Sequence, residues 1–178
     1  MAGRDARRGL LRLGMPPATV SLRRVFPWAS FVSCADLQAT HVTDHCDDCR
    51  PGSLFVAIPG TRYHGEQFVQ EAIRRGAVGL LVSRPIPDAV VPQCVVRDVR
   101  GAYSRLLATF AGRPHESLKT LAVTGTNGKT TVSWMLRSII AAAGSTCGML
   151  GTIEYSDGVQ TVSAELTNAG PVDVWDRV

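Results

Sequence analysis

Residues 121–144 read LAVTGTNGKTTVSWMLRSIIAAAG, which is a short apolar run, a glycine-rich loop and a periodic segment in succession. The apolar run at residues 121–123 predicts a buried strand. In the periodic segment, apolar side chains recur every three or four residues until Gly144 supplies a stop signal, which predicts a helix with one apolar face. The apolar positions are Val132, Met135, Leu136, Ile139, Ile140 and Ala143. Strand, loop and helix in this order predict an α/β fold in which the helix packs on a sheet.

The loop at residues 124–131 has the composition that phosphate binding requires. Gly125 and Gly128 allow backbone conformations that turn successive N–H groups inward, and the following helix directs its positive N-terminal end at the same point. Lys129 is placed to reach the β- and γ-phosphates of ATP, and the Thr130 hydroxyl is placed to hold Mg²⁺, so both are candidate catalytic groups. The candidate ATP-binding set is Gly125, Thr126, Asn127, Gly128, Lys129, Thr130 and Thr131.

The match to the general phosphate-loop pattern is incomplete, because Val123 stands where that pattern begins with glycine. A glycine-rich turn before a capped helix is therefore an alternative interpretation, and Thr130 is also a residue type favoured at helix starts. The context favours phosphate binding, since the loop follows a predicted strand and opens a periodic helix.

Upstream of this stretch the sequence alternates between strand and helix patterns. Turn residues at 51–52 precede an apolar strand at residues 54–58, a helix is expected over 66–76, and a second strand over 78–82. This order predicts a βαβ unit, which normally has parallel strands. A further strand at residues 95–96 then leads into another helix.

Asp98 is expected to cap that second helix, whose apolar face comprises Val99, Ala102, Tyr103, Leu106, Leu107 and Phe110. The Gly-Arg-Pro sequence at residues 112–114 ends the helix and indicates a domain boundary. We therefore expect a basic arm at residues 1–20, an N-terminal domain at 21–114, and the incomplete start of a parallel-sheet domain with a phosphate loop at 115–178.

The formal net charge of +4 is concentrated at the N-terminus, where residues 1–24 contain six arginines and one aspartate. The rest of the chain is close to neutral, so a basic arm is favoured over a nucleic-acid-binding face. Arg12 and the prolines at 16–17 interrupt the only early apolar stretch, which argues against a secretory signal, and no run reaches the length of a membrane span. We expect a cytoplasmic monomer without nucleic-acid or membrane partners.

Five cysteines are an odd set, without the density of a secreted disulfide scaffold. His41, His45, Cys46 and Cys49 place four candidate metal ligands within nine residues. Zinc sites usually combine two ligand pairs from separate elements, and no second pair follows. An ordinary polar loop is favoured, with a zinc site and a CxxC redox site as the alternatives.

The TGTNGKTT sequence at residues 124–131 resembles the phosphate loop of the Mur ligases, which build the peptide of the bacterial cell-wall precursor. PGSLFVAIPGTRYHGEQFVQEAIRRGAVGLLV, at residues 51–82, is similar to the N-terminal UDP-binding domain of that family. GMLGTIEY, at residues 148–155, favours the members that add the third amino acid of the peptide, in many bacteria meso-diaminopimelate. The resemblance covers about residues 20–178.

The resemblance implies an ATP-dependent ligase. The γ-phosphoryl group of ATP would pass to the D-glutamate side-chain carboxylate of UDP-N-acetylmuramoyl-L-alanyl-D-glutamate, and the incoming amine would displace phosphate to form an amide. Members of the family have later domains that this chain does not match, so the resemblance implies a fragment, or the product of a truncated gene.

The resemblance also implies sugar-nucleotide contacts, and here the sequence departs from the family pattern. His45-Cys46-Asp47 stands where the family has Asp-Ser-Arg, and Asn168 and Ala169 follow Thr167 where Thr-Thr-Pro is expected. The candidate substrate-binding residues are Cys46, Thr61, Arg62, Tyr63, Thr167 and Asn168. These departures leave a second hypothesis, a non-catalytic remnant or nucleotide-binding module. A third, a ligase related to folylpolyglutamate or cyanophycin synthetases, shares the phosphate loop, but the similarity of residues 51–82 to the UDP-binding domain argues against it.

Overall fold

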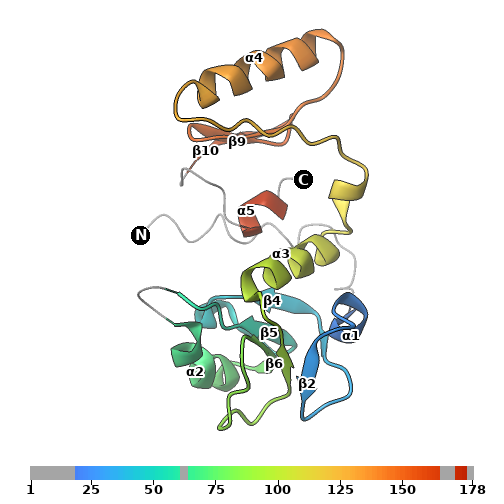
Figure 1. Ribbon diagram of the computed structural model, residues 1–178, viewed down its shortest axis with the longest axis vertical. Coiled ribbons are helices and arrows are strands. Elements are labelled where there is room, and N and C mark those ends of the chain that lie inside the picture. The colour runs from blue at the N-terminus through green and yellow to red at the C-terminus, as the bar shows by residue number, and fades with distance from the viewer. Residues whose placement is uncertain (1–18, 61–63, 165–170, 176–178) are drawn as a thin grey trace. The chain divides into compact units, whose positions relative to one another are not determined.

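The computed structural model describes residues 19–60, 64–164 and 171–175. It separates into two compact units, of which the first ends at Phe110 and the second begins at Ala111 (Figure 1). The sequence pattern placed the corresponding boundary at residue 114. An α/β architecture is confirmed in the first unit, where helices accompany a five-stranded sheet.

The sheet of the first unit has the strand order β2-β7-β6-β5-β4. Its strands are β2 (Ser30–Val32), β4 (His41–Thr43), β5 (Ser53–Val56), β6 (Ala77–Val82) and β7 (Gln93–Val95). Four of them run parallel, while β2 pairs antiparallel with β7 and makes the sheet mixed. The expected βαβ unit is confirmed, because β5 and β6 pair in parallel around a helical connection. That connection consists of a 3₁₀ turn, η3 (Gly65–Phe68), and helix α2 (Val69–Arg74).

Gly76 ends α2 for a steric reason. Its φ of 102° lies in the left-handed region, and a Cβ there would come within 2.9 Å of the Pro51 backbone nitrogen. Helix α2 can therefore turn into β6 only with glycine at this position. The remaining elements of the first unit are β1 (Val20–Ser21), α1 (Leu22–Val25), β3 (Gln38–Ala39), the 3₁₀ turn η2 (Cys46–Asp48) and α3 (Val99–Phe110).

The core of the first unit includes a cluster between the sheet and α2, in which Phe55 and Leu80 are fully buried with apolar residues of that helix. Leu106 of α3 is also fully buried. Asp98 caps α3 as expected, since its Oδ1 accepts a hydrogen bond from the Gly101 amide at 2.9 Å. The predicted apolar face of this helix is buried except for Phe110, which is half-buried.

The second unit differs from the expected parallel sheet. Its elements are η4 (Pro114–Glu116), α4 (Lys129–Ala142), β8 (Met149–Leu150), β9 (Glu154–Ser156), β10 (Thr161–Ser163) and α5 (Pro171–Trp175). The three strands pair antiparallel in the order β10-β9-β8. The prediction of a parallel sheet is wrong for these residues, because connections as short as 151–153 and 157–160 can join only antiparallel neighbours.

Residues 121–123 do not form the strand that their apolar character predicted. Leu121 is 67% exposed, and no strand among the described residues pairs with this segment. The predicted strand over residues 146–150 is reduced to Met149 and Leu150. An apolar run adopts strand structure only when a neighbouring strand accepts its backbone hydrogen bonds.

Helix α4 lies over β9 and β10, and only part of its expected apolar face is covered (Figure 1). Leu136 and Ile140 are half-buried, but Val132, Met135 and Ile139 are 44%, 59% and 64% exposed. Arg137 links the helix to the sheet, since its guanidinium forms an ion pair with Glu154 of β9 at 2.6 Å. Strands of two or three residues are too short to cover the whole apolar face of a 14-residue helix.

Among the described helices, none combines the length and the apolar character that crossing a bilayer would need.

Candidate functional site

The glycine-rich loop leads directly into α4, the longest helix of the described chain. Gly128 is the N-cap residue and has a φ of 76°, and Gly125 has a φ of 149°. A Cβ on Gly128 would meet nothing within 4 Å, so its left-handed backbone, and not a lack of space, calls for glycine. Gly128 has no side chain, so the N-cap residue makes no side-chain hydrogen bond to the backbone amides of the first turn of α4. The helix therefore presents an uncapped positive end at the loop, which is a geometry suited to an anion.

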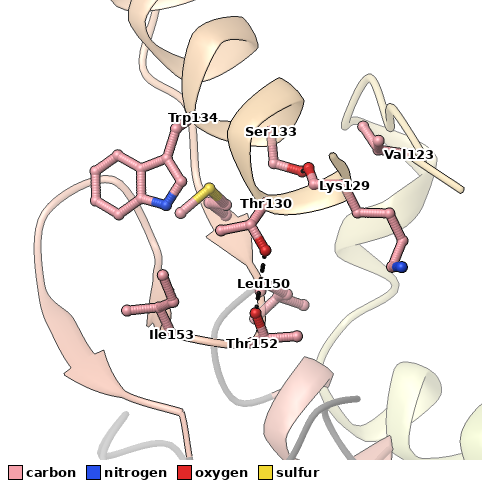
Figure 2. A pocket seen from close by; sticks show the side chains of 10 residues that line it. Val123, Lys129, Thr130, Ser133, Trp134, Leu150, Thr152 and Ile153 are labelled. Carbon is pink, nitrogen blue, oxygen red and sulfur yellow. Dashed lines mark hydrogen bonds between the residues drawn. The ribbon is translucent and has the colours of Figure 1, made fainter. Parts of the chain in front are cut away.

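Lys129 and Thr130 leave the helix start in different directions, as Figure 2 shows. The Lys129 Nζ folds back on its own loop, where it donates hydrogen bonds to the carbonyl oxygens of Gly125 at 2.7 Å and Thr126 at 3.3 Å. The ammonium thus lies over the loop that was expected to hold the phosphates, within reach of any anion bound there.

The Thr130 hydroxyl points into a pocket of about 130 Å³ between α4 and the β8–β9 connection (Figure 2). Its Oγ1 lies 3.2 Å from the Oγ1 of Thr152. The lining residues are Val123, Lys129, Thr130, Ser133, Trp134, Met149, Leu150, Gly151, Thr152 and Ile153. The pocket is smaller than the roughly 300–1,000 Å³ of whole-ligand sites, so it suits one part of a larger ligand that extends over the loop.

The residues around the pocket fit Mg²⁺ held together with a nucleotide. This cation prefers oxygen ligands and usually combines one or two protein groups with phosphate oxygens and water. The Thr130 hydroxyl supplies such an oxygen at the mouth of the loop. Within the described ranges, no three His, Cys, Asp or Glu side chains gather as a metal-binding cluster. The cation would therefore depend on the ligand phosphates for most of its coordination.

Cys46, the first candidate substrate contact, lies in η2 of the first unit and is half-buried. Next to it, the Asp47 carboxylate pairs with the Arg75 guanidinium at 3.1 Å, so its negative charge has a local partner. Burial and the neighbouring Cys46 and Asp48 raise the pKa of the Cys49 thiol to about 11. A thiol with this pKa is almost entirely protonated at neutral pH and is a poor nucleophile or metal ligand.

The other candidate substrate contacts, Thr61, Arg62, Tyr63, Thr167 and Asn168, lie outside the described residues. A second hollow of about 430 Å³ opens in the first unit, where the parallel strands β6 and β7 end. It is lined by Trp28, Ser30, Ser83, Val95, Val96 and Arg97, and Cys46 is not among them. No local sequence pattern indicated this hollow, because its residues come from three separate segments.

Sequence reasoning also missed the contribution of Thr152. This residue follows Thr130 by 22 positions and belongs to no local motif with it. The GMLGTIEY sequence contains Thr152, but only the fold of the β8–β9 connection brings its hydroxyl to Thr130.

Comparison with known proteins shows which protein family the chain resembles. Residues 123–174 match the model of the Mur ligase middle domain. The chain is 37% identical over 136 residues to the UDP-N-acetylmuramoyl-L-alanyl-D-glutamate--2,6-diaminopimelate ligase of Aquifex aeolicus, which covers 76% of this chain and 28% of the relative. It is 38% identical over 143 residues to the enzyme of the same name from Solibacter usitatus, covering 78% of this chain and 29% of that protein.

Solved structures agree with the fold. A crystal structure of MurF from Acinetobacter baumannii matches with a TM-score of 0.54 and 27% identity, over 72% of this chain and 29% of that one. A UDP-N-acetylmuramoyl-L-alanyl-D-glutamate--2,6-diaminopimelate ligase structure matches 90% of this chain and 33% of its own, with a TM-score of 0.61 and 20% identity. The chain thus spans less than a third of the length of the curated relatives that it matches. With matches to the middle-domain model and to these relatives along most of its length, the chain belongs to the Mur ligase family.

Proposed function

We propose that residues 124–131 bind the phosphates of ATP together with Mg²⁺, and that this binding serves an ATP-dependent amide ligation. The observation that carries the proposal is the start of α4, where an uncapped helix end, the Lys129 ammonium and the Thr130 hydroxyl surround one loop. Helix N–H groups and a lysine stabilise phosphate oxygens, and a threonine hydroxyl suits magnesium.

The acceptor would be UDP-N-acetylmuramoyl-L-alanyl-D-glutamate and the added amino acid meso-diaminopimelate. Similarity to diaminopimelate ligases from Aquifex aeolicus and Solibacter usitatus supports this choice. The D-glutamate carboxylate would attack the γ-phosphorus and release ADP, giving an acyl phosphate. The amine would then attack the acyl carbon and release phosphate. Bound Mg²⁺ supplies charge neutralisation to the transferring group.

The residues of this chain would contribute by positioning and charge. Lys129 would exchange its bonds to the loop carbonyls for bonds to the β- and γ-phosphates. The amides at the start of α4 would hold phosphate oxygens without having to reorganise, which is how most phosphoryl-transfer sites lower the barrier. Cys46, Thr61, Arg62, Tyr63, Thr167 and Asn168 would contact the sugar nucleotide and its peptide.

The second candidate function is a nucleotide-binding module without ligase activity. The observation that favours it is Asp47, an anion beside the Cys46 position where the diphosphate of the substrate is expected. The ion pair between Asp47 and Arg75 lessens this repulsion but does not turn the site cationic.

Calorimetric titration with MgATP tests the nucleotide site. The sequence has two lysines, Lys129 and the exposed Lys119, which provide a matched pair of variants. Lys129→Ala should weaken binding about tenfold or more, because a charge-assisted hydrogen bond is lost. Lys119→Ala should leave the affinity unchanged. Wild-type protein without saturable binding, or equal losses in the two variants, would refute the site.

Product analysis separates ligase from module. The chain is incubated with MgATP, UDP-N-acetylmuramoyl-L-alanyl-D-glutamate and meso-diaminopimelate, and both phosphate release and the new amide are followed. Ligase function requires that both appear only when all three substrates are present. MgATP binding without any amide product would favour the module.

A further inference from the structure

The Thr130 hydroxyl differs in its hydrogen bonding from the two serines of the same helix. Ser133 and Ser138 donate to the carbonyl oxygens four residues earlier, Lys129 at 2.9 Å and Trp134 at 3.0 Å. Serine and threonine hydroxyls inside a helix commonly form this hydrogen bond to the carbonyl oxygen four residues earlier. The hydrogen bond found for Thr130 instead joins its Oγ1 to the Oγ1 of Thr152 at 3.2 Å, outside the helix (Figure 2).

Thr130 is the second residue of α4, so the residue four positions earlier, Thr126, lies in the loop before the helix. The Thr126 carbonyl accepts a hydrogen bond from the Lys129 Nζ at 3.3 Å. The Thr130 hydroxyl instead meets Thr152 at the pocket.

Thr152 is held by structure that is independent of the loop. It lies in the tight connection between β8 and β9, which the hydrogen bond from the Gly151 amide to the Glu154 carbonyl closes at 3.1 Å. Glu154 is tied to α4 by its ion pair with Arg137, and both side chains are less than one-third exposed. The Thr152 hydroxyl is therefore placed beside Thr130 before any ligand arrives.

A hydroxyl has one proton and two lone pairs. When it coordinates a cation through a lone pair, its proton is repelled by the cation and needs an acceptor on the other side. We infer that Thr152 is a positioning residue: its Oγ1 accepts the Thr130 proton and leaves a Thr130 lone pair directed at the magnesium of a bound nucleotide. The inference rests on the proposed function, since it requires a nucleotide with its cation.

The test compares ATP affinity in Mg²⁺ with ATP affinity in a chelator, for the full chain and its variants. Thr152→Val keeps the shape of the side chain and removes the acceptor. We expect it to reduce the gain in affinity that Mg²⁺ provides by about fivefold, the scale of one hydrogen bond, and to leave the metal-free affinity unchanged. Thr152→Ser retains a hydroxyl and should restore most of the gain.

Ser138→Ala is the matched control, because it removes a hydroxyl from the exposed side of the same helix, and it should alter neither affinity. Thermal unfolding establishes that each variant is folded. A Thr152→Val protein that matches the wild type would overturn the inference, and so would one that loses affinity equally with and without Mg²⁺. If the wild type binds ATP but gains nothing from Mg²⁺, the positioning role fails while the nucleotide site stands. If the wild type binds no ATP, both fail.

Discussion

The Tyr103 hydroxyl lies in the core of the first unit and donates a hydrogen bond to Asp44 Oδ1 at 3.1 Å. Burial, together with the charge of Asp44, raises the pKa of this phenol well above its ordinary value, so the group stays neutral and keeps donating. The bond connects α3 to the segment that follows β4, across 59 residues of sequence. One side chain thus joins the helix to the neighbourhood of the Cys46 turn.

Tyr103→Phe removes only this hydroxyl. We expect the free energy of unfolding of the first unit to fall by about 1–2 kcal/mol, because the carboxylate loses a donor while the ring keeps its packing. Urea unfolding followed by circular dichroism measures the change. Thr109→Val, which removes an exposed hydroxyl from the same helix, should stay within about 0.5 kcal/mol of the wild type. Equal effects of the two substitutions would contradict the proposed importance of the Asp44 bond.

Glu66 forms two hydrogen bonds with Arg84, at 3.1 and 2.8 Å, and the Arg84 contact lowers the pKa of this carboxyl below its ordinary 4.5. A lowered pKa in the folded state adds stability above pH 4.5, and that contribution is lost as the pH falls through the folded value. Glu66→Gln should therefore be slightly less stable than the wild type at pH 7. The difference should shrink below pH 4.5 in parallel urea titrations, and a difference independent of pH would argue against it.

At the scale of elements, α3 and α4 have similar apolar patterns but different surroundings. Leu106 of α3 is fully buried, whereas Ile139 of α4 is 64% exposed. Leu106→Ala should cost about 2–5 kcal/mol of unfolding free energy, since it leaves a cavity in a packed core. Ile139→Gln should change it by no more than about 0.5 kcal/mol. Denaturant unfolding of both variants checks the contrast, and a large loss for Ile139→Gln would mean that this face is covered in solution.

The elements that the sequence predicted correctly are those with local determinants. The βαβ unit could be found because Gly76 ends α2 and apolar runs flank it, and Asp98 is a cap recognisable from its type and position. The strand predicted at residues 121–123 was wrong because a strand needs neighbouring strands to pair with, and the local sequence does not show whether they are present. The predicted face of α4 was right only in part, because which of its residues are covered depends on contacts between elements, such as the ion pair between Arg137 and Glu154, that no local pattern reports.

The residues of the candidate site also fall into those that the local sequence predicts and those that it does not. The loop at residues 124–131 could be read from its glycines, lysine and threonine, because phosphate binding by a helix start is a local property of the chain. Thr152 and the hollow beside Trp28 could not be read, since their residues meet only through the fold.

At the scale of the whole molecule, buried residues are distributed unequally between the two units. The apolar core belongs to the first unit, and in the described part of the chain from Ala111 onward only Tyr155 and Ser156 are buried. Burial of apolar surface is the main favourable term in folding. The second unit should consequently open far more readily than the first.

Hydrogen exchange followed by mass spectrometry checks this expectation. Amides of α4 should exchange at least about tenfold faster than those of β5 and β6. MgATP should slow exchange in α4 and the preceding loop and leave the sheet of the first unit unchanged, because a ligand stabilises only the state that binds it. Equal protection of α4 and β5 without nucleotide would contradict the unequal distribution of stability.

The contacts of Lys129 with the Gly125 and Thr126 carbonyls have a kinetic consequence. An arriving phosphate competes with the backbone for this ammonium, and not only with water. Each productive encounter then includes an exchange of hydrogen-bond partners, and association slows when such a rearrangement must accompany binding. The residence time of the lysine on its own loop therefore becomes one of the rates that govern how quickly a nucleotide is captured.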